Sequence, residues 1–103
     1  MTLLEKMLDS NVEVILSYQD KLHDLKDDQE ILQIELEKIA SDFLDFEASL
    51  EEWYDGHSGW YNMDHDNDPE YARLLSERTK AKNVLDWACL AFGYDQGEIF
   101  RGV

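Results

Sequence analysis

Apolar residues recur through the first half of the chain at alternating intervals of three and four. This is the a and d spacing of a heptad repeat, which places its members on one face of an α-helix. Two members, Asn11 and Gln29, are polar. The positions are Met1, Leu4, Leu8, Asn11, Ile15, Tyr18, Leu22, Leu25, Gln29, Leu32, Leu36, Ile39, Phe43, Phe46, Leu50 and Trp53. We call them the heptad stripe, and they predict helix over residues 1–54.

The heptad stripe allows either one long helix or several helices with tight joints, because residues 1–55 contain no Gly or Pro. Two segments match a capping box, in which one side chain caps the amide three residues on and a Glu reaches back. They are Ser10 with Glu13 and Asp27 with Glu30. Such matches arise by chance in acidic chains, so the unbroken stripe carries more weight.

The periodic pattern stops at residues 55–68, where Gly, Ser, Asn and Asp predict a loop. A second helix is expected over residues 69–92, with Asp68 as N-cap, Pro69 in its first position and Gly93 as the C-terminal cap. Residues 93–103 form a tail that could hold a short helix or a strand. The apolar face of the second helix is expected to hold Tyr71, Leu74, Arg78, Ala81, Leu85, Ala88 and Phe92.

Together these elements predict a single all-α domain over residues 1–103, in which a heptad-patterned helix or helical hairpin packs with a second helix as a coiled-coil-like bundle. A helix over residues 11–54 would be about 65 Å long and one over 69–92 about 35 Å. The shorter helix cannot cover the stripe of the longer one. We therefore expect a homodimer, or else breaks that fold the first helix into a compact bundle.

The charges beside the stripe bear on the direction of such a dimer. In a parallel pair, Lys21 of one copy would meet Lys26 of the other, and Asp42 would meet Glu47. Both contacts are repulsive, so antiparallel packing is favoured.

Acidic residues outnumber basic ones by 24 to 9, a net charge of −15, and they are unevenly placed. Residues 1–70 sum to −16 and residues 71–103 to +1. Between Lys38 and Arg73 there is no Lys or Arg, but there are ten carboxylates: Asp42, Asp45, Glu47, Glu51, Glu52, Asp55, Asp64, Asp66, Asp68 and Glu70. A like-charged run on a folded chain suits a basic protein partner, whereas nucleic acid and anionic membranes need Lys and Arg.

Catalytic and metal-binding motifs are weak in this sequence. The run from Asp64 to Asp68 alternates oxygen ligands like the start of a calcium loop, but Pro69 and Leu75 stand where an EF-hand needs Gly and Glu. His57 and the histidine of that run lack the spacing of a zinc motif. We expect no enzyme, cofactor or metal site, with both histidines in a polar loop.

Compartment is indicated by two weaker features. The single cysteine, Cys89, excludes an internal disulfide and is expected to pack as a small hydrophobe. The segment Met1 to Asn11 lacks a basic region followed by an apolar run, so neither a signal peptide nor a membrane span is expected. These features favour a cytoplasmic protein.

Aromatic residues gather around the loop: Trp53, Tyr54, Trp60, Tyr61 and Tyr71. Trp53 belongs to the heptad stripe. Trp60 and Tyr61 either fold the loop onto the helices or serve as interface anchors, and the two roles are compatible.

In size and acidity the chain resembles the small phage-encoded DNA mimics of the anti-restriction and anti-CRISPR type, and less closely the acidic immunity proteins of nuclease toxins. The resemblance covers size and charge only. It implies an inhibitor that binds the nucleic-acid-binding surface of a nuclease, restriction or CRISPR effector in the host cytoplasm. The expected partner-binding residues are Asp42, Asp45, Glu47, Glu51, Glu52, Asp55, Asp64, Asp66 and Asp68 as phosphate substitutes, with Trp60 and Tyr61 as apolar anchors.

The alternative is a coiled-coil adaptor or structural homodimer whose acids only keep it soluble. An adaptor normally balances its acids with Lys and Arg. The gap between Lys38 and Arg73 therefore favours the mimic.

Overall fold

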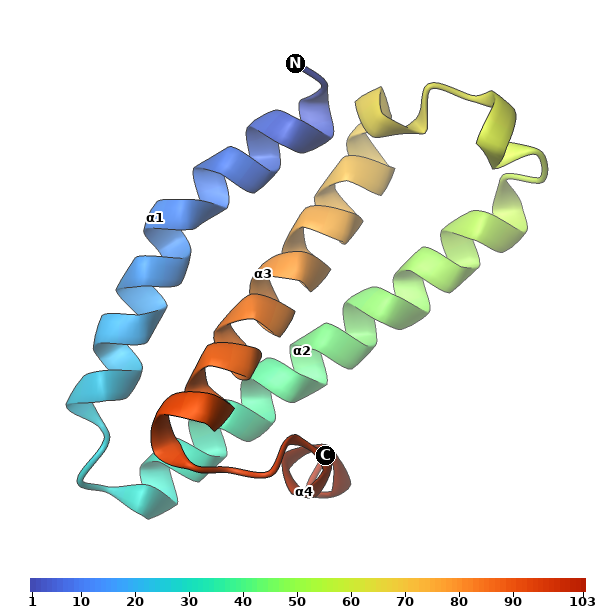
Figure 1. The fold of residues 1–103 in the computed structure, drawn as a ribbon. Helices are drawn as coiled ribbons and strands as arrows, with labels where there is room; N and C mark the ends of the chain where they lie inside the picture. The colour runs from blue at the N-terminus through green and yellow to red at the C-terminus, as the bar shows by residue number, and fades with distance from the viewer.

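The computed structural model describes residues 1–103 except for the side chain of Trp60. All secondary-structure elements of its described part are helices and it contains no strand, so the all-α prediction is confirmed (Figure 1). The elements are α1 (Leu3–Asp24), α2 (Gln29–Gly56), the short 3-10 helices η1 (Trp60–Asn62) and η2 (His65–Asn67), α3 (Pro69–Phe92) and α4 (Gln96–Arg101).

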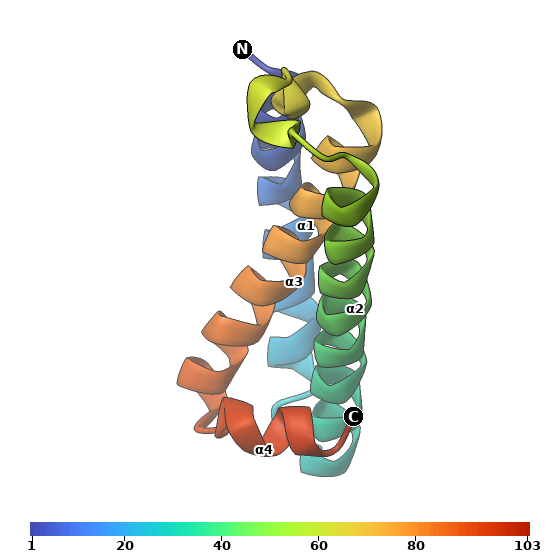
Figure 2. The ribbon, with the colours of Figure 1, turned by 90° about the vertical axis from the view of Figure 1, so that its right-hand side faces the viewer.

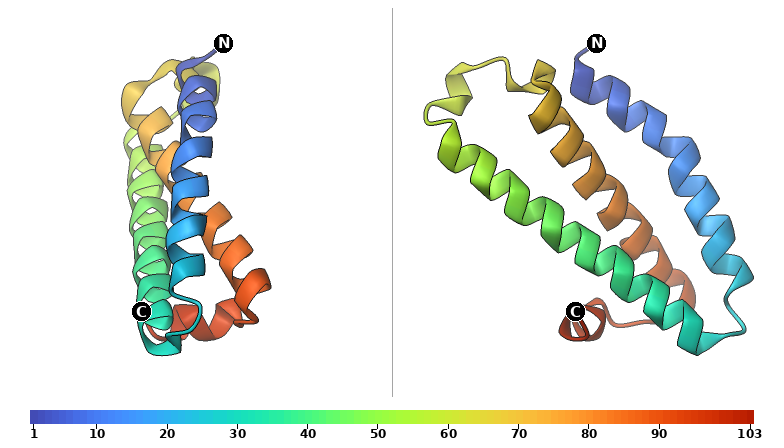
Figure 3. Two further views of the ribbon diagram at one scale, coloured as in Figure 1. Left: turned by 90° about the vertical axis from the view of Figure 1, so that its left-hand side faces the viewer. Right: turned by 180° about the vertical axis from the view of Figure 1, so that it is seen from behind.

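Helix α3 lies between α1 and α2 in the view of Figure 1, and the side views show its C-terminal half leaning out of their plane (Figures 2 and 3). The molecule measures 48 × 28 × 16 Å, so it is about as thin as a pair of packed helices allows. Helix α2 runs antiparallel to α1 and α3 (Figure 1). Helix α4 crosses the lower ends of α2 and α3 (Figure 2). Each outer helix therefore finds its packing partner in α3.

The heptad stripe is broken between α1 and α2, which was one of the two outcomes left open by the sequence. Helix α2 starts after Asp28, whose side chain accepts a hydrogen bond from the Ile31 amide at 3.2 Å. Asp27 was expected as this cap and lies one residue too early. Ser10 was the other candidate and is also wrong, because it lies inside α1 and donates to the Met7 carbonyl at 2.8 Å.

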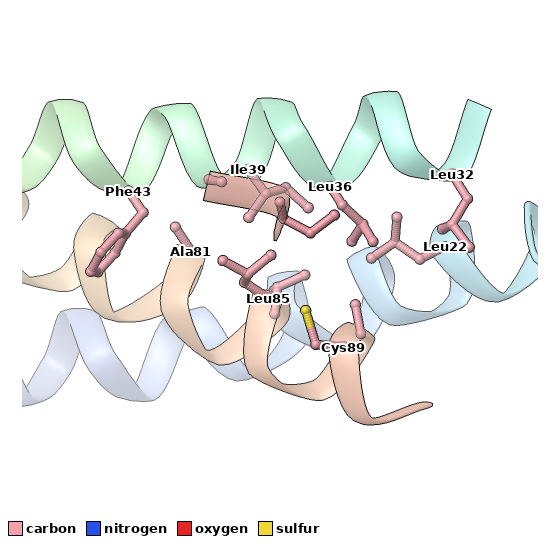
Figure 4. Close-up of a cluster of buried hydrophobic side chains, with 12 residues drawn as sticks. Leu22, Leu32, Leu36, Ile39, Phe43, Ala81, Leu85 and Cys89 are labelled. Carbon is pink, nitrogen blue, oxygen red and sulfur yellow. The ribbon is translucent and has the colours of Figure 1, made fainter. Parts of the chain in front are cut away.

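The break turns one long apolar stripe into two shorter ones that both face α3. Leu22 from α1 meets Leu32 and Leu36 of α2 near the turn, and α3 closes this cluster with Leu85 and Cys89 (Figure 4). A second cluster near the other end joins Leu4, Leu50, Trp53, Tyr71, Ala72 and Leu74. Burying each large side chain stabilises the fold by about 1.5 to 3 kcal/mol. Stripe members at the chain start and the turn, Met1 and Gln29, are exposed.

Helix α3 is buried on two sides because it lies between two helices. Its predicted apolar face packs as expected, but Ala72, Ser76 and Val84 are buried as well. Ser76 meets the one polar stripe member that is buried: the Asn11 side-chain amide donates to the Ser76 hydroxyl at 2.7 Å and to its carbonyl at 3.1 Å. Such a buried polar pair fixes the position of α1 along α3.

The ends of α3 follow the sequence prediction. The Asp68 side chain accepts from the Tyr71 amide at 2.9 Å, and Gly93 takes the left-handed conformation, with φ of 76°, that ends the helix. The tail then forms a helix rather than a strand. Asp95 caps α4, and Ile99 is 2% exposed. Among the described helices, none is long and apolar enough to cross a membrane.

Candidate functional site: the acidic surface of α2

Six of the nine predicted partner-binding carboxylates lie on α2 between Asp42 and Asp55. The inward side of this segment is taken by the stripe residues Phe43, Phe46, Leu50 and Trp53, so the acids turn outward. Five of them are exposed, and Glu47 is partly buried. We call the six side chains the α2 acidic surface: Asp42, Asp45, Glu47, Glu51, Glu52 and Asp55.

The α2 acidic surface has two stripes, because each residue turns a helix by about 100°. Asp42, Asp45 and Glu52 form one stripe, and Glu47, Glu51 and Asp55 form the other. Together they span 13 residue steps, about 20 Å, or one charge per about 3.3 Å of axis. A single DNA strand carries one per about 3.4 Å. The density matches one strand of a duplex rather than both.

Most of these carboxylates lack a cation. Within the described structure, Glu47 forms the single ion pair of the α2 acidic surface, with Arg78 of α3 at 3.5 Å. Glu35, two turns before this surface, behaves differently: it lies 3.4 Å from Lys21 and 3.3 Å from Lys38. Partial burial raises the pKa of Glu35, but the two lysines outweigh that effect and hold it below its usual value. Glu35 therefore differs from most of the α2 acidic surface, because two lysines lie close enough to pair with it.

The C-terminal end of α2 is an unfavourable place for negative charge. The helix dipole points its negative end there, and the last turn of α2 contains Asp55 and no basic residue. Like charges three or four residues apart add repulsion. The acids near Asp55 therefore oppose folding rather than support it.

The loop carboxylates have local structural roles. Asp68 caps α3, Asp66 lies 3.5 Å from the His65 ring, and Asp64 accepts from Asn67 at 2.7 Å. The same Asn67 accepts a hydrogen bond from the Leu3 amide at 3.0 Å, which ties the start of α1 to the loop. Helix η2, which contains Asp66, contacts α1 and α3.

The aromatic cluster is mainly structural. Trp53 is 3% exposed and stacks on His57 with ring centroids 4.1 Å apart. Burial and a hydrogen bond with Tyr54 raise the pKa of Tyr71 to about 12. Tyr61 is 71% exposed, whereas the side chain of the other predicted anchor, Trp60, lies outside the described residues.

Helix α3 carries a polar network that the sequence did not reveal. Its Lys82 bonds Asp86 at 3.0 Å and also Gln96, whose amide donates to Asp86 at 2.6 Å, so this network holds α4 in place. Burial raises the pKa of Asp86, but the bonds from Lys82 and Gln96 hold it below its usual value. Cys89 is buried in the core as predicted, and burial raises the pKa of its thiol.

Two cavities line the seam between α2 and α3. The first, of about 90 Å³, is formed by Tyr18, Ile39, Asp42, Phe46, Glu77, Lys80, Ala81 and Val84. The second, of about 310 Å³, is formed by Ser49, Glu52, Trp53, Gly56, His57, Glu70, Arg73 and Leu74. Each brings one carboxylate of the α2 acidic surface beside side chains of α3.

No three or more His, Cys, Asp or Glu side chains of the described structure are grouped to hold a metal ion. Comparisons of the chain with protein-family models, with curated proteins and with solved structures gave no match.

Proposed function

We propose that this protein is an acidic inhibitor that binds the nucleic-acid-binding surface of a nuclease or another DNA- or RNA-binding protein. One observation carries the proposal: α2 displays carboxylates at about the charge spacing of a DNA strand, and five of the six lack a cation within the described structure. A basic groove that accepts phosphates could accept these side chains instead.

The α2 acids destabilise the fold, and this effect supports the same proposal. They repel one another and oppose the dipole of α2, so their presence lowers stability. Unpaired charge on a rigid helix steers a cationic partner and speeds association at low salt. The protein would act as a phage anti-defence or nuclease-immunity factor in the host cytoplasm, without a cofactor and without catalysing a reaction.

Charge reversal tests the proposal. Changing Asp45, Glu52 and Asp55 to Lys should abolish capture of the basic partner from lysate of the native host while the helical circular dichroism stays unchanged. The matched control reverses Asp9, Glu13 and Asp20, which are two Asp and one Glu exposed on α1. The control should retain capture. Equal loss in both variants would show that net charge matters rather than α2, and unchanged capture would refute the role of α2.

A structural homodimer or coiled-coil adaptor is the second candidate, and the shape of the molecule favours it. The accessible surface is 6497 Å², whereas a compact protein of this mass exposes about 6000 Å². Val12 and Leu16, one turn apart on α1, are each 55% exposed. Sedimentation tests this candidate: a dimer that Val12→Glu with Leu16→Glu converts to a monomer would support it, and a monomeric wild type would exclude the dimer.

A further inference from the structure

The two cavities are repeats of one another along the seam of α2 and α3. Each α3 residue that lines the second cavity is followed, seven positions later, by one that lines the first. On α2, which runs the other way, Ser49 and Trp53 of the second cavity lie seven positions after Asp42 and Phe46 of the first, whereas Glu52 and Gly56 have no such counterpart. Seven residues are close to two helical turns, so the cavities share one face and lie about 10 Å apart. The pairs are Glu70 and Glu77, Arg73 and Lys80, Leu74 and Ala81 on α3, and Ser49 and Asp42, Trp53 and Phe46 on α2.

This face is directed away from α4. Helix α4 is held through Lys82 and Asp86 of α3. Lys80 and Val84 line the first cavity, and they lie two positions before Lys82 and Asp86 respectively. Two positions turn a helix by about 200°. The cavities therefore lie on the opposite side of α3 from α4, where a partner can approach the seam.

The first cavity suits an apolar side chain. Its walls include Ile39, Phe46 and Val84. Of its three charged lining residues, Glu77 and Lys80 pair with each other at 2.7 Å, whereas Asp42 forms no ion pair with a described side chain. An apolar group placed there would leave the Lys80 ion pair intact. Its volume of about 90 Å³ is enough for part of one such side chain.

The second cavity suits a cation. Glu52 and Glu70 line it, and neither forms an ion pair with any described side chain, while Arg73 is the single lysine or arginine among its lining residues. Carboxylates therefore outnumber cations among its lining residues by two to one. A guanidinium or ammonium group from a partner would restore the balance and gain charge-assisted hydrogen bonds.

We infer that the seam receives one amphipathic helix of the basic partner, with an apolar side chain in the first cavity and, seven residues away, an arginine or lysine side chain in the second. This inference rests on the proposed function and states which face of α2 docks. A spacing of about 10 Å matches two turns of the incoming helix. The net charge of −15 opposes a second copy of this chain as the occupant.

A synthetic basic helix of about 20 residues is the probe, with Leu and Arg seven positions apart on one face. Its control peptide has the same composition, with that Leu moved to the opposite face. Two variants of the full chain are compared by titration calorimetry at low salt: Asp42→Asn with Glu52→Gln, and Glu51→Gln with Asp55→Asn. All four side chains are exposed on α2, and each variant loses one Asp and one Glu charge.

Neutralising Asp42 and Glu52 should weaken peptide binding at least about tenfold more than neutralising Glu51 and Asp55. The control peptide, in which the Leu is moved, should bind the wild-type protein about tenfold more weakly than the probe does. Amide signals of Gly56 and Ala81 should shift on titration. Equal effects of the two variants, or of the two peptides, would overturn the seam while leaving the acidic-surface proposal in place. Absence of binding by either peptide would contradict both. If the same amide signals shift with protein concentration in the absence of peptide, the seam would instead be the interface with a second copy of the chain.

Discussion

Neutralising Glu51 and Asp55 together should make the protein more stable. Both side chains are exposed and without an ion pair in the described structure. Glu51 lies four residues from Glu47 and from Asp55, and Asp55 lies three residues from Glu52. The change to Gln and Asn removes these three like-charge contacts and one charge from the negative end of the α2 dipole.

The expected gain follows from these contacts. Each like-charge pair costs about 0.2 to 0.5 kcal/mol, and a carboxylate at a helix C-terminus costs about 0.3 to 1 kcal/mol. Their sum predicts an increase of about 1 to 2.5 kcal/mol in the free energy of unfolding at low salt. The gain should shrink in about 1 M salt, where the screening length falls to about 3 Å.

Urea unfolding followed by circular dichroism at low and high salt measures this difference. Glu35→Gln is the control. It should lower the free energy of unfolding, because it removes a carboxylate that Lys21 and Lys38 stabilise. A loss of stability on neutralising Glu51 and Asp55, or a gain that salt does not reduce, would show that these acids support the fold. The argument that they are kept for binding would then fail.

Three further outcomes test the fold. Asp28→Ala should lower the free energy of unfolding by about 1 kcal/mol through loss of the α2 N-cap, whereas Asp27→Ala should change it by under about 0.5 kcal/mol in the same urea titration. Asn11→Ala should cost about 2 kcal/mol because it breaks two buried hydrogen bonds to α3, and thermal unfolding should show a smaller loss for Ser10→Ala, which is exposed. The pKa of Tyr71 is raised to about 12, so its contribution to the free energy of unfolding is fully present below pH 10 and is lost as the pH rises toward 12. Tyr71→Phe should reduce this loss of stability at alkaline pH. Parallel curves of stability against pH for the two proteins would contradict the prediction.

Local rules explain which parts of the fold could be predicted. Burial of Leu36 and Trp53 follows from periodicity alone, and the start of α3 follows from Asp68 and Pro69, whose capping chemistry acts within one turn. The turn before α2 was harder because no Gly or Pro marks it. Asp28 competes with helix continuation there, and the packing of both outer helices on α3 favours the break.

The second buried side of α3 could not be found from its sequence. Ala72 and Ser76 are small and do not form an apolar stripe, and they are buried because α3 lies between two helices. The same limit applies to the candidate site. The carboxylates of α2 were predicted as a group, but the cavities beside Asp42 and Glu52 depend on the register of α2 against α3.

The central claim is that the α2 acidic surface replaces nucleic acid on a basic protein. The most direct measurement is affinity capture from lysate of the native host at two salt concentrations, with mass spectrometry of the bound proteins and a challenge with duplex DNA. The account predicts a nucleic-acid-binding protein that both salt and DNA release. A captured partner that neither salt nor DNA displaces would contradict the account.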